Sequence, residues 1–384
     1  MSKSLKSFLA KKFPDASNTK ILEEIMWVNT GDPALNYVLS GLPASGGIPL
    51  SGKITILYGP EGAGKTSIIA DWIAKTQEAH IEVVFIDTER SMTKKRLQQF
   101  NVNIDDLIYL TPDSMEECFD IIEKIYDDRI DSGSEEPVLI IWDSIASAPT
   151  VKQLERTSEQ VEIAAEAGVI TRNIKRIRGK IQKINAGLII INQARANQAM
   201  FGDLFTMPGG HALQHNADVI LRVNRTKPDV NGQIIKVSTP SKNRLFRPFQ
   251  SIEMRLEYEN GFTKENKINN FLQFLKKIEV ICSAGAYNYF RADVDEIMEK
   301  EGLSEKEATK KAKKFHLKAV VEQMVNDEDY YKKMIDKAEQ LVNTSLLKVL
   351  KVMQDPEFKE EIDKEEALEV AIENEFNTSK SIEE

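Results

Sequence analysis

Residues Gly59 to Thr66 have the residue types and the spacing of a phosphate-binding loop. They match the pattern G-x-x-x-x-G-K-[ST] at every fixed position, follow an apolar run and open a helical one. Glycines let backbone amides curl around phosphates, Lys65 can reach the β- and γ-phosphate oxygens, and the Thr66 hydroxyl can ligate Mg²⁺. The sequence therefore predicts that ATP and Mg²⁺ bind here. The predicted nucleotide contacts are Gly59, Pro60, Glu61, Gly62, Ala63, Gly64, Lys65, Thr66 and Ser67.

Two carboxylates that follow other apolar runs could complete a hydrolytic site. Asp143 ends the run 138–142, so we expect it to be the second protein partner of Mg²⁺, after Thr66. Glu89 follows the run 83–86 and is the predicted general base that polarises the attacking water. Asp87 is the alternative base, although we expect its place on the strand to turn its side chain to the opposite face.

A polar strand end and a long loop follow these carboxylates in the sequence. Gln193 ends the run 188–191 and would lie beside the γ-phosphate, where an amide can report whether that phosphate is present. The stretch from 194 to 208 has no strong periodicity, and a loop of that length is usually functional or disordered. Arg195, Asn197, Gln198 and Phe201 in this stretch suit phosphate contact and base stacking, the chemistry of single-strand binding. The predicted DNA contacts in and next to it are Arg195, Asn197, Gln198, Met200, Phe201, Gly209 and Gly210.

Short apolar runs that alternate with helical stretches must position these residues. We expect strands at 54–58, 83–86, 107–110, 138–142, 188–191 and 219–223, with helices at about 66–79, 114–127 and 159–184. Continuous apolar runs indicate strands covered on both faces, so the pattern predicts a three-layer α/β core with a mostly parallel sheet. The runs 234–237 and 249–258 have no helix between them, which favours antiparallel strands that extend the sheet.

The composition is that of a globular chain without a membrane span or a secretory signal, so we expect a cytoplasmic protein. We interpret Cys118 and Cys282 as core residues in helical surroundings rather than as a disulfide. The histidines His80, His211, His215 and His316 have no metal-ligand spacing.

Charge is distributed unevenly along the chain. The net charge is −9, but residues 355–384 hold twelve acidic and three basic side chains and read as a flexible tail. Without this tail the chain is nearly balanced. Two basic clusters remain, at 172–180 and at 242–247, and Arg172 and Arg176 are further candidate DNA contacts. A solvated helix face is the more ordinary interpretation of the first cluster.

Taken together, these motifs resemble the RecA family of DNA strand-exchange ATPases and, more loosely, the phage UvsX recombinases. The resemblance rests on the order and spacing of segments over most of the chain. They are 28–31, 59–66, 85–89, 143–144, 191–193, 200–202, 209–213, 242–249 and 284–289.

The resemblance implies a DNA-dependent ATPase that forms a helical filament on single-stranded DNA and exchanges strands with a homologous duplex. ATP would lie between neighbouring subunits, with Lys242 and Arg244 reaching the neighbour's phosphates and loops 150–163 and 194–210 lining the DNA. Single-strand-binding and mediator proteins would be further partners. The implied division is an N-terminal oligomerisation segment at 1–28, an ATPase core at 29–264, a C-terminal DNA-gateway domain at 265–352 and an acidic tail at 353–384.

The sequence departs from the family pattern at the base of the nucleotide. Arg96 stands where the family has a tyrosine against adenine, so stacking would come from the guanidinium plane or from elsewhere. Trp142 and His215 also differ from the usual residues. A hexameric helicase with the same nucleotide fold and a non-catalytic ATP-binding recombination mediator remain as alternatives. The intact Lys65 and Glu89 argue against the second of these.

Overall fold

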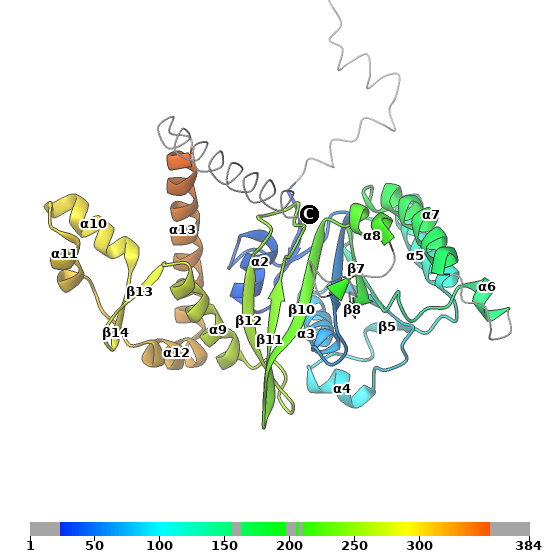
Figure 1. Ribbon diagram of the computed structural model, residues 1–384, viewed down its shortest axis with the longest axis horizontal. Coiled ribbons are helices and arrows are strands. Elements are labelled where there is room, and N and C mark those ends of the chain that lie inside the picture. The colour runs from blue at the N-terminus through cyan, green and yellow to red at the C-terminus, as the bar shows by residue number, and fades with distance from the viewer. Residues whose placement is uncertain (1–23, 156–162, 197–204, 207–209, 354–384) are drawn as a thin grey trace, which may run out of the picture.

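The computed structural model describes residues 24–155, 163–196, 205–206 and 210–353. Its centre is a twisted eight-stranded sheet, in the order β12-β11-β10-β3-β7-β6-β4-β5 (Figure 1). The strands from β10 to β5 are parallel, and β11 and β12 continue the sheet antiparallel beside β10. The sheet strands are β3 (Lys53–Gly59), β4 (Glu82–Asp87), β5 (Leu107–Leu110), β6 (Val138–Asp143), β7 (Ala186–Gln193), β10 (Val219–Asp229), β11 (Gly232–Ser238) and β12 (Ser251–Glu257).

Helices cover both faces of this sheet. Figure 1 shows α5, α7 and α8 together on one side of the strands, where buried residues such as Ile56, Ile140 and Ile190 pack. The helices of the core are α2 (Pro33–Ser40), α3 (Lys65–Glu78), α4 (Lys94–Gln99), α5 (Met115–Ser132), α6 (Val151–Leu154), α7 (Ile163–Ile181) and α8 (Gly210–Asn216). The predicted three-layer α/β core is confirmed.

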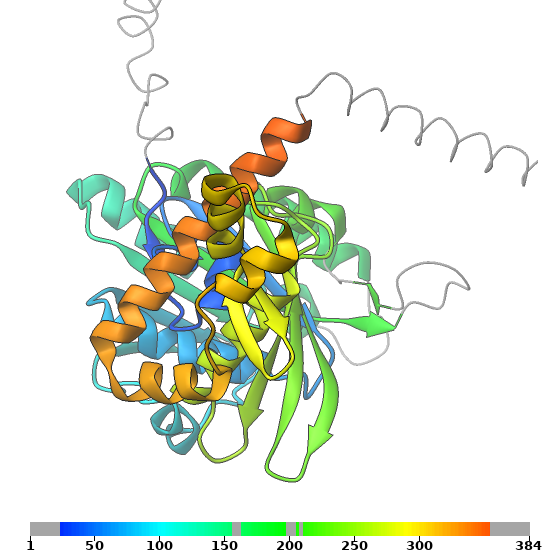
Figure 2. The same ribbon diagram turned by 90° about the vertical axis from the view of Figure 1, so that its left-hand side faces the viewer.

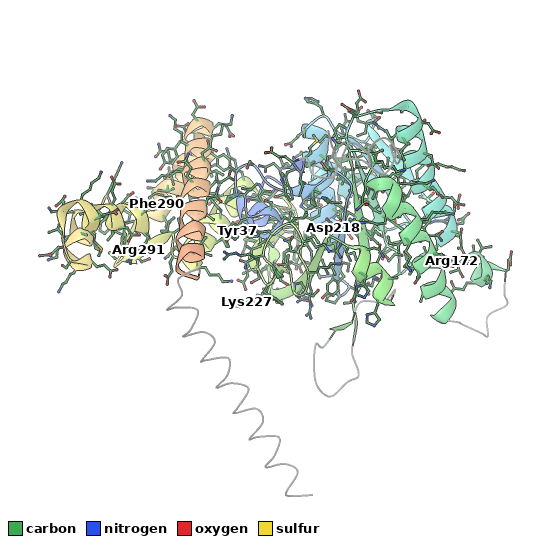
Figure 3. The ribbon with its side chains drawn as sticks, turned by 90° about the horizontal axis from the view of Figure 1, so that it is seen from above. Tyr37, Arg172, Asp218, Lys227, Phe290 and Arg291 are labelled. Carbon is green, nitrogen blue, oxygen red and sulfur yellow. The ribbon has the colours of Figure 1, made fainter. Side chains whose placement is uncertain are left out.

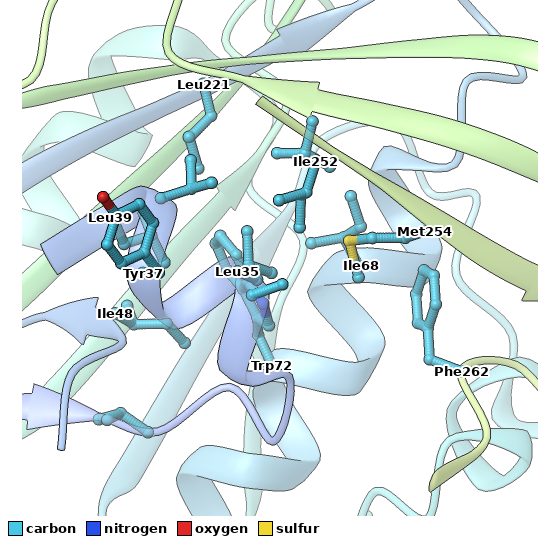
Figure 4. Close-up of a cluster of buried hydrophobic side chains, with 14 of the residues drawn as sticks. Leu35, Tyr37, Leu39, Ile48, Ile68, Trp72, Leu221, Ile252, Met254 and Phe262 are labelled. Carbon is cyan, nitrogen blue, oxygen red and sulfur yellow. The ribbon is translucent and has the colours of Figure 1, made fainter. Parts of the chain in front are cut away.

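The opposite face of the sheet packs against α2 and α3. Figure 4 shows Leu35 and Leu39 of α2 and Trp72 of α3 in one buried cluster with Ile252 and Met254 of β12. Alternate strand residues point to the two faces, which is why the apolar runs are continuous. Removing so much apolar surface from water is the main term that stabilises this arrangement.

One expected strand is less covered than its apolar run suggests. β5 is the edge strand of the sheet, and Ile108 and Tyr109 are 45% and 40% exposed. The expectation that 107–110 is buried on both faces is therefore wrong. An edge strand has a neighbour on one side only, so part of its surface stays open to solvent.

The chain beyond the sheet forms further helices and a hairpin. These elements are α9 (Lys264–Lys277), β13 (Ile281–Ala284), β14 (Tyr287–Phe290), α10 (Arg291–Glu301), α11 (Glu305–Lys311), α12 (Leu317–Asn326) and α13 (Glu328–Met353). Cys118 is fully buried in α5 as expected, but Cys282 lies in β13 and is half-buried. The helical surroundings and the core position expected for Cys282 are therefore both wrong.

Part of this C-terminal region shares the core of the α/β fold. Phe271 of α9, Met324 of α12 and Ala338 of α13 belong to the same buried cluster as α2 and α3, whereas Val294 and Ala308 form a small cluster of their own. Figure 2 shows α13 running diagonally across this end of the molecule. The predicted boundary between residues 264 and 265 stays a prediction.

Two smaller pairings lie outside the large sheet and the β13–β14 hairpin. β1 (Trp27–Val28) pairs with β2 (Ile48–Pro49), and β8 (Arg195–Ala196) pairs with β9 (Phe205–Thr206). The predicted N-terminal segment at 1–28 and the predicted acidic tail at 353–384 lie outside the described residues, apart from 24–28 and residue 353. Among the residues that the structure describes, no helix is both long and apolar enough to cross a membrane.

Candidate nucleotide-binding and active site

The glycine-rich segment lies between the end of β3 at Gly59 and the start of α3 at Lys65. Gly62 and Gly64 have φ values of +69° and +97°, in the left-handed region that glycine adopts without strain. The Lys65 ammonium donates hydrogen bonds of 2.9 Å to the carbonyl oxygens of Gly59 and Pro60. The loop thus folds around the Lys65 side chain and leads directly into the N-terminus of α3.

A cleft of about 460 Å³ opens beside this loop. It brings together the loop after β3, helix α4 and residues on or just after six other strands, including most of the residues predicted for the site. The lining residues are Glu61, Gly62, Ala63, Gly64, Lys65, Thr66, Ser67, Glu89, Arg96, Asp143, Gln193, Arg225, Gln233, Leu256 and Tyr258.

Glu89 and Gln193 meet in this cleft. The Gln193 amide nitrogen donates to Glu89 Oε1 at 2.8 Å, and the Ser144 hydroxyl donates to the same oxygen at 2.7 Å. Strands β4, β6 and β7 are neighbours in the sheet and end together, so their following residues converge. The predicted base and the predicted γ-phosphate sensor are therefore in direct contact.

Asp87 has a different environment from Glu89. Its carboxylate is fully buried and accepts hydrogen bonds from the backbone nitrogens of Arg90 and Met92 and from the Tyr109 hydroxyl. These three donors hold the turn after β4. Asp87 therefore has the contacts of a structural carboxylate, and Glu89 is the one that lines the cleft.

Asp143 is buried and Lys65 is half-buried, and both line the cleft together with Glu89. Burial raises the pKa of Asp143 to about 7, the Glu89 and Asp87 carboxylates add to this, and Lys65 opposes it. Burial also lowers the pKa of Lys65 from its ordinary value, with Asp143 opposing. Burial disfavours the ionised form of this carboxylate, and a nearby cation would stabilise that form.

The residues fit a magnesium ion held jointly with nucleotide phosphates. Within the described ranges, no cluster of three or more histidine, cysteine, aspartate or glutamate side chains could hold a metal alone. Mg²⁺ on a phosphate-binding loop takes few protein ligands and keeps water and phosphate oxygens. Thr66 and Asp143 at the cleft match that donor set.

Arg96 reaches the cleft from helix α4. Its guanidinium donates to the Ser67 hydroxyl at 2.5 Å and lies 5.5 Å from the centre of the Phe100 ring. This contact fixes the guanidinium beside the phosphate-binding loop. Tyr258, which follows β12, also lines the cleft and is 50% exposed.

Sequence reasoning missed four lining residues, which lie on β10, β11 and β12 or directly after β12. Arg225, Gln233, Leu256 and Tyr258 enter the cleft because β10 pairs with β3, and β11 and β12 continue the sheet from there. The Gln233 amide donates to the Gly62 carbonyl at 3.4 Å. The one signal in the sequence for such a residue was a polar side chain within a mostly apolar strand. That signal does not indicate which strands are neighbours in the sheet.

The predicted DNA loop is described only at its base. Arg195 pairs with Thr206 across β8 and β9, and Gly210 begins α8. The remaining loop contacts lie outside the described residues, namely Asn197, Gln198, Met200, Phe201 and Gly209. β8 begins two residues after Gln193, so the base of this loop is joined directly to the cleft.

The basic cluster on α7 consists mainly of ion-paired side chains. Arg176 pairs with Asp120 and Glu123, and Lys180 pairs with Glu123 and Asp127 of α5. Arg172 is exposed at the outer part of this helix (Figure 3). Arg172 and Arg176 as DNA contacts stay predictions.

Lys242 and Arg244 are not in the cleft of their own chain. The Lys242 ammonium donates to the carbonyls of Gln214 and His215, and Arg244 also donates to His215. Their backbones bond to Ile220 and Asp218, at the start of β10, whereas the phosphate-binding loop follows the far end of the parallel strand β3. The two sets of residues thus lie at opposite ends of the same strands.

Comparison with known proteins gives a consistent result. The family model of the RecA N-terminal domain matches residues 6–263. Protein RecA of Bacillus licheniformis is 30% identical over 288 residues, covering 73% of this chain and 80% of that protein. Protein RecA of Symbiobacterium thermophilum is 29% identical over 291 residues, covering 73% of this chain and 80% of that protein.

The match spans the sheet that builds the cleft, the phosphate-binding loop, and the strand ends that bear Glu89, Asp143 and Gln193. The chain belongs to the RecA family of DNA-dependent ATPases, which carry out homologous pairing and strand exchange in recombination and repair.

Proposed function

We propose that this protein uses the cleft at Gly59–Thr66 to bind ATP with Mg²⁺, and that the bound ATP controls the assembly of a protein filament on single-stranded DNA. The observation that carries the proposal is the hydrogen bond between Gln193 and Glu89, with β8 starting two residues later. It connects the hydrolytic centre to the base of the predicted DNA loop.

The residues of the cleft have distinct roles in this proposal. The loop amides and Lys65 hold the phosphates, while Thr66 and Asp143 hold Mg²⁺, which would neutralise charge on the β- and γ-phosphate oxygens. Glu89 accepts the proton of the attacking water. Arg96 and Tyr258 offer a guanidinium plane and a ring for the adenine, since both line the cleft.

Gln193 is the proposed switch. It is exposed in the cleft and bonds to Glu89 through a single amide hydrogen, so a γ-phosphate that competes for this amide would move it. Such a movement would reach β8 and the loop at 194–210 directly. ATP binding would then favour DNA binding, and hydrolysis would weaken it.

The proposal extends to the whole assembly. We propose that Lys242 and Arg244 contact the nucleotide of a neighbouring protomer, that segment 1–28 docks on that neighbour and that 265–352 receives duplex DNA. Single-strand-binding and mediator proteins would regulate loading in the cytoplasm. The position of Lys242 at the other end of the sheet supports the first of these, because one chain cannot complete its own site.

The test is the rate of ATP hydrolysis with and without single-stranded DNA, together with electron microscopy of the complexes. We expect DNA to stimulate the rate, Lys65→Ala to abolish it and helical filaments to form with ATP. Phe201→Ala should weaken DNA binding and leave nucleotide affinity unchanged. Closed rings, or a rate that does not respond to DNA, would contradict the proposal.

A further inference from the structure

Behind Glu89 lies a chain of hydroxyl groups that the proposed mechanism does not use. The Ser144 hydroxyl, which donates to Glu89 Oε1, lies 3.2 Å from the Ser147 hydroxyl. The Ser147 hydroxyl lies 2.9 Å from that of Thr88, which accepts from the indole nitrogen of Trp142 at 3.3 Å. This hydroxyl chain runs from a buried tryptophan to the carboxylate in the cleft.

We propose that Ser144 is the positioning residue that orients Glu89 for hydrolysis, and that Trp142, Thr88 and Ser147 hold Ser144 in place. The inference rests on the proposed role of Glu89 as general base. The side chains involved do not contact the nucleotide, so they would act only by holding Glu89 in position.

The carboxylate geometry gives the first step. Ser144 and Gln193 both donate to Oε1 of Glu89, and within the described residues Oε2 accepts no hydrogen bond. Two donors on one oxygen fix the rotation of the carboxylate about its terminal bond. The other oxygen, Oε2, is then the one available to accept a proton from water.

The two donors to Glu89, Ser144 and Gln193, differ in burial. Ser144 is fully buried, whereas Gln193 is exposed and is the proposed switch. When Gln193 moves toward a γ-phosphate, Ser144 remains as the donor on Oε1. Ser144 therefore keeps Glu89 oriented in both states of the switch.

The number of available protons determines which way the Ser144 hydroxyl points. An ionised carboxylate only accepts, so the single Ser144 hydroxyl proton must point to Glu89 rather than to Ser147. Ser147 can donate to the Ser144 carbonyl at 2.8 Å and accept from the Ser144 backbone nitrogen at 3.3 Å. Ser147 thus bonds to the backbone of Ser144 on both sides.

Thr88 and Trp142 anchor the other end of the hydroxyl chain. The Thr88 hydroxyl also lies 2.8 Å from the Ser144 carbonyl, so it contacts the same backbone that Ser147 holds. Trp142 is fully buried and packs edge-on against Phe119, with ring centres 5.1 Å apart. A large ring locked in the core gives its N–H a fixed direction.

The first variant removes the donor itself. For Ser144→Ala we expect kcat of ATP hydrolysis to fall about 10-fold or more, since a hydrogen bond to a charged group is lost. The KM for ATP should stay within about twofold, because Ser144 does not touch the nucleotide. The fall should be equal with and without DNA, whereas Gln193→Ala should remove mainly the DNA stimulation.

The second variant acts at a distance from Glu89. Thr88→Val keeps the shape of the side chain and removes its hydroxyl, and we expect kcat to fall about 3- to 10-fold. Thr88→Ser restores the hydroxyl and should restore most of the rate. Thr76→Val is the matched control, because this buried threonine donates to the Trp72 carbonyl at 2.7 Å, away from the cleft.

The double variant Ser144→Ala/Thr88→Val decides whether the groups act as a chain. If Thr88 acts through Ser144, the double variant should be no slower than Ser144→Ala alone. The inference would be overturned if the losses in kcat of the two single variants multiplied in the double variant. It would also be overturned if Ser144→Ala had the kcat of the wild type. A wild-type protein that does not hydrolyse ATP would instead refute the proposed function. Thermal unfolding and binding of a fluorescent ATP analogue confirm that each variant is folded.

Discussion

At the scale of single residues, two carboxylates near the cleft differ in what holds them. Glu89 lines the cleft and bonds to Ser144 and Gln193, whereas Asp87 is fully buried and accepts from two backbone nitrogens of its own turn and from the Tyr109 hydroxyl of β5. Sequence alone left Asp87 as an alternative base. Their separate surroundings make the choice testable by paired substitutions.

We expect Glu89→Gln to lower kcat by about 100-fold or more, since a general base contributes that much, and to leave ATP affinity and stability nearly unchanged. Asp87→Ala should instead destabilise the fold by about 2 kcal/mol or more, because buried donors lose their acceptor. Single-turnover hydrolysis and urea unfolding measure the two effects. A stable but inactive Asp87→Ala protein would favour Asp87 as the base.

The effect of Asp32 on the free energy of unfolding should depend on pH. It caps α2 by accepting from the backbone nitrogens of Ala34 and Leu35 through Oδ1, and its Oδ2 is buried without a hydrogen-bond partner. Burial raises the pKa of Asp32 to about 6, and Lys267 opposes this. The folded state therefore favours the protonated form more than the unfolded chain does.

The sign of the effect follows from this raised pKa. The contribution of Asp32 to stability is fully present below about pH 4 and is lost as the pH rises through about 6. Asp32→Asn keeps the capping oxygen and removes the charge. We expect it to raise the free energy of unfolding at pH 7.5 by about 1–3 kcal/mol, with the gain vanishing near pH 4. Urea unfolding at both pH values checks this, and a gain independent of pH would contradict it.

At the scale of elements, the basic stretch on α7 divides into structural and exposed positions. Arg178 forms a two-point ion pair with Asp218, at 2.5 and 2.8 Å, and Asp218 also accepts from the Ile54 backbone nitrogen at 2.9 Å. Figure 3 shows Asp218 near the middle of the molecule and Arg172 at its periphery. This pair joins α7 to the start of β3 and β10.

Arg178→Met should destabilise the protein by about 2–4 kcal/mol, because it leaves the Asp218 carboxylate buried without its main partner. Arg244, 3.8 Å away, replaces only part of the lost attraction. Arg172→Ala is the matched variant on the same helix. We expect it to leave the melting temperature unchanged and to weaken DNA binding with a smaller salt dependence. If Arg178→Met unfolds at the wild-type temperature, the ion pair contributes nothing measurable.

At the scale of the whole molecule, the fold separates groups that we propose to act on one nucleotide. Lys242 and Arg244 bond to the end of α8 near the start of β10, and the phosphate-binding loop lies after the opposite end of β3. A head-to-tail contact between protomers would bring the two ends together. Each protomer would then supply one half of every site.

Mixing two inactive variants tests this arrangement. Glu89→Gln provides a normal Lys242, and Lys242→Ala provides a normal Glu89. In an equal mixture, about a quarter of the shared sites combine both normal halves, so about a quarter of the wild-type rate should return. Neither variant alone should be active. If the mixture stays inactive while filaments still form on DNA, Lys242 does not act on the neighbour's nucleotide.

The sequence by itself predicted the features that depend on neighbours along the chain. The phosphate-binding loop is one continuous segment whose glycines and lysine have fixed spacing, and the alternation of strands and helices follows from periodicity. The α/β core, its antiparallel extension and the family were therefore predictable. The order of the strands, with β5 at the edge and Tyr109 half-exposed, was not.

Only the tertiary structure decided which distant side chains meet. Ser144 reaches Glu89 across 55 residues, Gln193 reaches it across 104, and Tyr258 enters the cleft from a strand beyond β10. Such contacts depend on which strands are adjacent and where each one ends, and hydrophobic periodicity is the same for several strand orders. Burial of Arg178 against Asp218 has the same origin, because an arginine on a helix reads as solvated until its neighbour is placed.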